Sequence, residues 1–339
     1  MEQWIEELFT DELLIEAAGR YGAAVSKSEK LGDFENYVFE VHINDTPYIL
    51  RLTHSSHRSK AAIEAEIDWV NFLHSHDINV SLVHPSRNGE LVEVIPAGDT
   101  SFFVCLFEKA PGQRVKISDE LFGPELFEKW GKITASMHSV SMDYQPGASR
   151  REDWLAEDLH NLPYYLDQQK DKEIISGGKQ IVNSINAMPK TKETFGLIHA
   201  DIHPGNFFYH DGEIHVFDFD DSVYFYYVSD IAIPIYYSVW IKHSGSSLEE
   251  RSRFGEELLY HFLKGYKTIL PLDPDFIKKI PLFLRLRDYD LYAVFHKKWD
   301  VATLGEKEQQ LLARIRNRLV TGELVAEINY DRLLSNLSR

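Results

Sequence analysis

The sequence is poor in cysteine and has no long apolar run. Its single cysteine, Cys105, cannot form an internal disulfide, so a reducing cytoplasm is the simplest compartment, and its apolar neighbours predict a buried thiol. The longest apolar stretch, residues 231–241, has about half the length that a membrane-spanning helix needs. The opening residues, MEQWIEELFTDELL, are acidic and amphipathic, unlike a signal peptide. We therefore expect a cytoplasmic protein that does not span a membrane.

Positive charge is also scarce. The chain has 36 Lys and Arg residues against 53 Asp and Glu residues, which gives a net charge of -17, and no basic block interrupts the acidity. Because nucleic acids and anionic membranes attract basic surfaces, we expect neither as a partner. What the sequence does contain is 44% hydrophobic and 13% aromatic residues in a chain of 339, enough for a sizeable core in two domains or lobes.

Short runs of alternating apolar and polar residues in the first third of the chain predict an antiparallel sheet. The pattern places five strands at residues 36–43, 47–53, 80–85, 90–95 and 101–107, with a helix over 59–74. Two amphipathic helices, with Thr10 as a cap and Gly22 as a stop, precede this sheet. We expect residues 1–107 to form these helices and a small nucleotide-binding lobe, followed by a hinge at 108–113.

The rest of the chain, residues 114–339, predicts a larger and mainly helical lobe. Helical spacing covers residues 124–141, 154–170, 179–188, 231–243, 248–270, 275–303 and 307–336. The predicted fold class is therefore α+β, with a small antiparallel-sheet lobe that contains one helix and a larger helical lobe that would carry catalysis and acceptor binding.

Residues 197–222 carry the most informative stretch, LIHADIHPGNFFYHDGEIHVFDFDDS. Asp201 and Asn206 have the spacing of the H-R-D-x-x-x-x-N loop of kinases, with alanine in place of the arginine, and Asp218 follows after a predicted hairpin. An amide oxygen and a carboxylate suit a hard cation such as Mg²⁺. A further carboxylate can orient an acceptor hydroxyl and accept its proton. The pattern therefore indicates phosphoryl transfer.

A transition-metal site is the competing interpretation of this stretch. Imidazole and carboxylate groups from His199, Asp201, His203 and Asp218 would suit zinc or iron. That interpretation leaves the Pro-Gly-Asn run at residues 204–206 unexplained, whereas the kinase pattern accounts for it.

The segments HADIHPGN and VFDFDDS resemble the aminoglycoside phosphotransferase and choline kinase superfamily. The hairpin ENYVFEV…YILRLTH, the helix IEAEIDWVNFL and the segment MHSVSMDY are also similar, so the resemblance covers nearly the whole chain. It implies a protein-kinase-like two-lobe fold that uses ATP and Mg²⁺. Carried over to this sequence, it implies a catalytic Asp201, metal ligands Asn206 and Asp218, and loop supports His199, His203 and Asp230.

The same resemblance implies a nucleotide site in the small lobe. Arg51 stands where V-A-I-K would place a lysine, and Glu66 stands where the superfamily has its ion-pair glutamate. Backbone groups from Phe107 to Lys109 would contact the adenine edge. The loop that would cover the phosphates has only Gly32, which departs from a glycine-rich pattern. An arginine can clamp phosphates and pair with Glu66, although Arg51 as an exposed strand residue is the alternative.

The acceptor site is expected in the helical lobe. The segment FLRLRDYDLYAVFHKKWD, residues 283–300, is dense in charges and aromatic rings, and carboxylates beside aromatic faces would suit an amine-bearing acceptor. A packing helix and a solvated or capping acidic pair are the competing structural interpretations. The candidate acceptor residues are Asp220, Asp221, Arg285, Asp288 and Tyr292.

The sequence thus predicts an ATP-dependent phosphotransferase that acts on a hydroxyl of a small, amine-bearing molecule. A serine/threonine protein kinase of the stress-response type is one alternative, although no APE-like segment follows Asp218. A catalytically weak nucleotide-binding regulator is another, and the glycine-poor loop and Arg51 are the features that favour it. The identity of the acceptor, the choice between ATP and GTP, and a homodimer all stay open.

Overall fold

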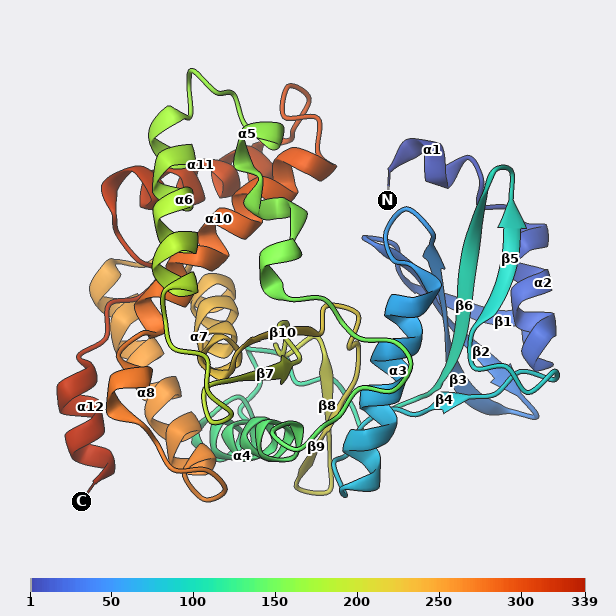
Figure 1. Ribbon diagram of the computed structural model, residues 1–339, viewed down its shortest axis with the longest axis horizontal. Coiled ribbons are helices and arrows are strands. Elements are labelled where there is room, and N and C mark those ends of the chain that lie inside the picture. Colours follow the sequence, from blue (N-terminus) through green and yellow to red (C-terminus); the bar gives the residue numbers. More distant parts are fainter. Residues whose placement is uncertain (1, 339) are drawn as a thin grey trace. The chain divides into compact units, whose positions relative to one another are not determined.

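The chain folds into two compact units in a computed structural model that describes residues 2–338 (Figure 1). The first unit runs to Gly112 and also takes residues 144–151 and 215–220, and the second contains the remainder. The first break therefore lies inside the 108–113 segment that we expected to act as a hinge. The two later segments belong to the first unit, although the sequence placed all of 114–339 in the second.

A six-stranded antiparallel sheet forms the centre of the first unit, in the order β1-β2-β3-β6-β4 with β5 paired to β6. Asn44 and Asp45 make the β2–β3 turn with φ values of 48° and 66°, as a tight hairpin between twisted strands requires. The strands are β1 Ala24–Gly32, β2 Asn36–Ile43, β3 Thr46–His54, β4 Val83–His84, β5 Glu93–Ala97 and β6 Thr100–Glu108.

Strand β1 is an edge strand that the sequence analysis missed. Its sequence, AVSKSEKLG, lacks the apolar alternation of a half-buried strand, and its pairing with β2 is irregular at two points. It forms because β2 offers its unpaired backbone groups as a template.

Helices cover both faces of this sheet. The helix α2 (Asp11–Tyr21) packs through Leu14 and Ala17 against one face, and α3 (Lys60–Ser75) packs through Ile63 and Ile67 against the other, where Cys105 is buried (Figure 1). The predicted caps of α2 are confirmed, since the Thr10 hydroxyl accepts the Leu13 amide and Gly22 has a φ of 76°. A single helical turn, α1 (Gln3–Glu6), precedes α2.

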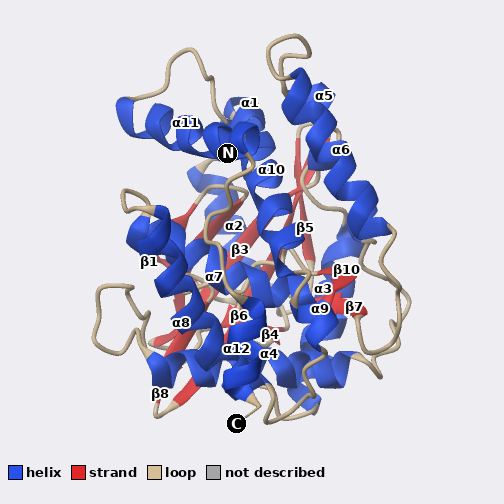
Figure 2. Ribbon diagram, turned by 90° about the vertical axis from the view of Figure 1, so that its left-hand side faces the viewer, coloured by secondary structure: helices blue, strands red, loops and turns tan. Residues whose placement is uncertain are grey.

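The second unit is mainly helical, as predicted (Figure 2). Its helices are α4 Pro124–Ser141, α5 Leu162–Tyr165, α6 Lys172–Asn186, α7 Tyr227–His243, α8 Leu248–Tyr266, α9 Pro274–Ile277, α10 Ile280–Lys298, α11 Glu306–Thr321 and α12 Tyr330–Leu337. Strand β7 (Phe195–Ile198) pairs with β10 (Val223–Tyr226), and β8 (Phe207–His210) pairs with β9 (Glu213–Val216). The chain enters the first unit within β9 and leaves it after Asp220.

Several predicted helices were wrong in extent: residues 275–303 form α9 and α10, and α6 begins at Lys172, well before the predicted start at residue 179. Residues 154–170 form two short 3₁₀ turns and the single turn α5, because the Asp153 carboxylate accepts the Leu155 amide and closes a tight turn there. Residues 307–336 form α11 and α12, since Gly322 takes a φ of 79° and ends α11. Across the described residues, no helix combines the length and the apolar character that a membrane crossing requires.

Helices α4 and α8 cross at a pair of glycines. A β-carbon on Gly131 would lie 1.8 Å from the peptide oxygen of Phe262, and one on Gly265 would lie 1.8 Å from that of Glu128. Both distances are far below van der Waals contact, so neither position has room for a side chain. The two backbones therefore touch directly, and this glycine crossing fixes the spacing of the two helices.

Candidate functional site: the catalytic loop and the Arg51–Glu66 pair

A strained turn carries the predicted catalytic loop out of β7. Ala200 has a φ of 66°, which is unfavourable for a residue with a side chain. The buried carboxylate of Asp230 accepts the amide of His199 at 3.0 Å and the amide of Ala200 at 2.8 Å. These two bonds offset the strain by satisfying the backbone groups of the turn. Asp230 thus makes the contacts expected of a residue that braces the loop.

A buried chain of side chains continues from Asp230. Its Oδ2 lies 3.3 Å from Nε2 of His138 on α4, and Nδ1 of His138 lies 2.9 Å from the hydroxyl of Tyr266 on α8. The sequence analysis assigned no role to His138 or Tyr266. His138 lies within MHSVSMDY, one of the segments that carry the family resemblance, and this position in the sequence could have identified it as a candidate site residue.

Asp201 is held from several sides within the second unit. Its Oδ1 accepts Nη2 of Arg287 at 2.6 Å, and its Oδ2 accepts Nδ2 of Asn206 at 3.2 Å and lies 3.3 Å from Nε2 of His203. Burial alone would raise the pKa of Asp201, but the Arg287 guanidinium and His203 outweigh it and hold that pKa below its usual value. The carboxylate is therefore ionised at neutral pH and fixed in direction.

The two loop histidines contact the backbone of the loop. Nδ1 of His199 accepts the Asp201 amide at 3.3 Å, and Nδ1 of His203 accepts the Gly205 amide at 2.9 Å. A β-carbon on Gly205 would lie 2.5 Å from the His203 ring, so this close approach requires glycine. Both histidines thus make the contacts of loop supports.

Asn206 presents its amide in an orientation that suits a metal ligand. Its Nδ2 donates to the backbone oxygen of Asp201 at 2.9 Å as well as to the carboxylate. The nitrogen end of the amide is thus directed at Asp201, and the oxygen end is the one left for a hard cation. Asp218, in the first unit, has a φ of 63°, a further strained backbone position in this stretch.

Arg287, on α10, is a site residue that the sequence analysis did not identify. Its Nη2 also donates to the hydroxyl of Tyr237, and its guanidinium carbon lies 5.1 Å from the centre of the Tyr237 ring. The side chain of Asp290 lies one turn further on, and burial raises its pKa. The predicted residue from this segment, Arg285, lies two positions away. Side chains two positions apart on a helix point about 200° away from each other, and the composition of the segment did not show which face of the helix meets Asp201.

The other residues of α10 that were predicted to bind the acceptor make contacts within the protein instead. Arg285 donates to the backbone oxygens of Arg318, at 2.7 Å, and Gly322. Asp288 is fully buried and accepts Nη2 of Arg318 at 2.5 Å, and Tyr292 is also buried. We leave these three residues, Arg285, Asp288 and Tyr292, out of the proposed acceptor site. Asp221 is half-buried in the second unit, where its charge adds to burial in raising the pKa of Tyr237.

In the first unit, the predicted Arg51–Glu66 pair is present and buried. The guanidinium donates to both carboxylate oxygens of Glu66, at 2.8 and 2.7 Å, and the two residues are 4% and 0% exposed. The exposed-strand interpretation of Arg51 is therefore wrong. The guanidinium carbon lies 4.8 Å from the centre of the Phe107 ring, and the Lys109 ammonium pairs with Glu40 at 2.7 Å.

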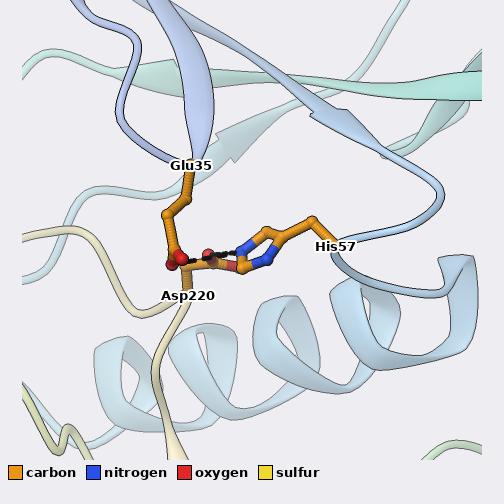
Figure 3. Close-up of side chains that lie close together, drawn as sticks. All are labelled: Glu35, His57 and Asp220. Carbon is orange, nitrogen blue, oxygen red and sulfur yellow. Dashed lines mark hydrogen bonds and ion pairs between the residues drawn. The ribbon is translucent and has the colours of Figure 1, made fainter. Parts of the chain in front are cut away.

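Asp220 also lies in the first unit, where it is 5% exposed and surrounded by donors (Figure 3). Nε2 of His57 lies 2.8 Å from its Oδ2, and Nε of Arg58 donates to its Oδ1 at 3.4 Å. Burial would raise the pKa of Asp220, but Arg58 and His57 hold it well below the usual range. The expected acceptor role for Asp220 is not supported, because protein donors already occupy its carboxylate.

A small antiparallel-sheet unit with a buried Arg–Glu pair and a helical unit with this Asp-Asn loop define a protein-kinase-like phosphotransferase fold. The chain belongs to the phosphotransferase enzyme family, whose model matches residues 29–266. Amicoumacin kinase from Bacillus subtilis (strain 168) is 36% identical over 334 residues, which cover 97% of this chain and 98% of that protein.

Solved structures agree with this assignment. Amicoumacin kinase hAmiN, in complex with AMP-PNP, Ca²⁺ and Ami, superposes with a TM-score of 0.92 at 31% identity, covering 98% of this chain and 100% of that one. The microcompartment-associated aminopropanol kinase has the same fold, with a TM-score of 0.74 at 20% identity over 97% of this chain and 98% of that one. The predicted family, two-lobe kinase fold and phosphotransferase class are thus confirmed.

Proposed function

We propose that the protein is an ATP-dependent small-molecule kinase that transfers the γ-phosphate to an acceptor hydroxyl. The observation that carries the proposal is the fixed Asp201 carboxylate, held by Arg287 and Asn206 in the loop pattern of kinases. The names of similar proteins support a small acceptor, since the relatives include an amicoumacin kinase and an aminopropanol kinase. Amicoumacin is therefore the first acceptor to test, followed by amino alcohols.

Asp201 orients the acceptor hydroxyl and receives its proton. Because the Arg287 ion pair lowers the pKa of Asp201, the carboxylate is a weak base. A weak base is sufficient where the transition state is loose and the proton moves late. Most of the rate then comes from positioning, and the bonds from Asn206 and His203 to Oδ2 provide it.

Asn206 and Asp218 are the proposed ligands of a divalent metal, Mg²⁺ in the cell. The donor set fits, because it is an amide oxygen and a carboxylate, which hard cations prefer. When bound, the metal neutralises charge on the phosphoryl oxygens. Arg51 and Glu66 support the nucleotide side as a buried pair, and backbone groups of residues 107–109 are the proposed adenine contact.

The proposed acceptor wall lies on α7 and α10 and begins beside Asp201. Arg287 supplies a positive charge next to the base, where it can stabilise charge that develops on the transferred phosphoryl group. Tyr237 supplies an aromatic face, and the groups proposed to meet an acceptor amine are the half-buried carboxylates of Asp221 and Asp290, of which Asp290 lies 3.6 Å from Nε2 of His160.

The test is a transfer assay with MgATP and a panel of acceptors. The panel contains amicoumacin, aminopropanol, aminoglycosides, choline, homoserine, sugars and a generic protein substrate, and the product is identified by mass spectrometry. We expect phosphorylation of a small acceptor that Asp201→Asn reduces about 10²–10⁴-fold in kcat.

Asp211→Asn is the matched control, because Asp211 has an 89% exposed side chain in the same unit and should leave kcat unchanged. Phosphorylation of the protein substrate alone would instead identify a protein kinase. Nucleotide binding without turnover of any acceptor in the panel would favour the alternative of a catalytically weak nucleotide-binding regulator.

A further inference from the structure

Five residues from three separate segments of the first unit meet around one carboxylate (Figure 3). We call Glu35, Asn36, His57, Arg58 and Asp220 the Asp220 cluster. Glu35 ends the glycine-poor loop between β1 and β2, Asn36 begins β2, and His57 and Arg58 lie between β3 and the N-terminus of α3. Asp220 follows Asp218 by two positions.

Side-chain donors converge on Asp220 from both partner segments. Nδ2 of Asn36 donates to Oδ2 at 3.1 Å, and Nε2 of His57 lies 2.8 Å from the same oxygen. Nε of Arg58 donates to Oδ1 at 3.4 Å, and a Glu35 carboxylate oxygen lies 3.5 Å from the same Nε2 of His57. Both carboxylate oxygens of Asp220 are thus used within the first unit.

The backbone of Asp220 is tied as firmly as its side chain. Nη2 of Arg151 donates to the Asp220 peptide oxygen at 2.5 Å, and Nη1 of the same guanidinium donates to the peptide oxygen of Ala62 on α3 at 3.1 Å. Arg151 belongs to one of the two later segments that join the first unit. The residues just after Asp218 are therefore connected directly to the helix that carries Glu66.

A metal ion is not needed to explain this cluster. One histidine and two carboxylates are common ligands of transition metals. Here, however, Asp220 faces the nitrogen of Asn36 and the guanidinium of Arg58, which are donors and do not ligate cations. The Arg58 guanidinium already balances its charge, and the His57 imidazole contacts its other oxygen. The geometry is that of a carboxylate that holds protein segments together.

We propose that Asp220 is a positioning residue that fixes the β1–β2 loop and the segment carrying Asp218 relative to α3, and thereby shapes the first unit for nucleotide phosphates. This inference rests on the proposed kinase function. It also explains how a phosphate-covering loop with only Gly32 can work, because side-chain bonds through Asn36 set its position. Backbone flexibility from several glycines is then not required.

The test measures binding of Mg-AMP-PNP by calorimetry and needs no acceptor. Asp220→Asn keeps the size of the side chain but removes the charge that Arg58 and His57 face. We expect its dissociation constant to rise about 10- to 100-fold, the range for losing charged hydrogen bonds. Asp77→Asn, an exposed aspartate of the same unit, is the matched control and should bind like the wild type.

A milder variant, Asn36→Ala, keeps the test decisive if Asp220→Asn does not fold. It removes one half-buried contact, so we expect normal melting, a raised ATP KM and a nearly unchanged kcat. In the double variant, the losses in nucleotide affinity should not add, because both substitutions weaken the same network of contacts around position 220.

Three outcomes would overturn the inference. Wild-type affinity in both Asp220→Asn and Asn36→Ala would show that the cluster does not position the nucleotide site. Loss of Mg²⁺ dependence in Asp220→Asn, with Asn36→Ala silent, would make Asp220 a metal ligand. Zinc binding by the wild type that His57→Gln abolishes would make the cluster a metal site. If the wild type itself binds no nucleotide, the proposed function fails and the inference falls with it.

Discussion

Replacing Arg287 with glutamine gives the sharpest test of the proposed active site. The substitution keeps a polar side chain of similar reach but removes the charge that faces Oδ1 of Asp201 at 2.6 Å. Asp201 would retain Asn206 and His203 on its other oxygen, so the loop should keep its shape. Activity and folding should therefore respond differently to this change.

The expected effect on the reaction is large. Removing one donor that faces developing charge lowers kcat about 10²–10³-fold in comparable enzymes. Loss of a largely buried charged hydrogen bond also costs about 1–3 kcal/mol in the free energy of unfolding. Without the guanidinium, burial would raise the pKa of Asp201 and make the carboxylate a stronger base, so the loss of kcat would come from the missing positive charge and not from a weaker proton acceptor.

The assay compares kcat, both KM values and urea unfolding for Arg287→Gln and for Arg316→Gln. The second variant is a matched control, because Arg316 pairs with the buried carboxylate of Asp171 at 3.0 Å elsewhere in the same unit. It should lose some stability and keep its kcat. The kcat of Arg287→Lys should lie between those of the wild type and Arg287→Gln, since lysine restores the charge without the planar geometry of the guanidinium. Equal kcat values for the two glutamine variants would refute the role proposed for Arg287.

Two further predictions concern buried groups. Asp230→Ala would leave the amides of His199 and Ala200 without their acceptor, so we expect the free energy of unfolding in urea to fall by about 2–4 kcal/mol. The kcat should fall as well, because the loop would be held less firmly. An unchanged unfolding curve would contradict the bracing role. Burial raises the pKa of Cys105 to about 12, so the thiol stays protonated and covered at pH 8. We therefore expect a thiol reagent to label Cys105 only as fast as the protein unfolds. Rapid labelling without denaturant would contradict the buried position.

The short-range features of the site could be predicted from the sequence. Asp201 and Asn206 are five positions apart on one loop, and their spacing carries enough geometry to identify the chemistry. Arg51 and Glu66 were paired correctly from the family resemblance, which places the ion-pair glutamate on the helix that follows the strand of Arg51. Caps and turns could also be predicted, since they depend on the conformational preferences of single residues.

Features that depend on distant parts of the chain could not be predicted. Asn36 and Asp220 are 184 positions apart, and nothing in either local pattern shows that they meet. The edge strand β1 owes its structure to its neighbour β2, so its own sequence looks like a loop. On α10, a difference of a single residue separates Arg287, which meets Asp201, from Asp288, which is buried against Arg318.

The glycine crossing of α4 and α8 has a consequence for the loop that carries Asp201. These two helices also supply His138 and Tyr266, which reach Asp230 and, through it, the catalytic turn. The crossing thus holds α4 and α8 where they brace Asp230, which lies on α7, the helix that also carries part of the proposed acceptor wall. A methyl group at Gly131 or Gly265 would therefore displace the support of the loop that carries Asp201, and we expect either alanine variant to lower kcat for every acceptor alike.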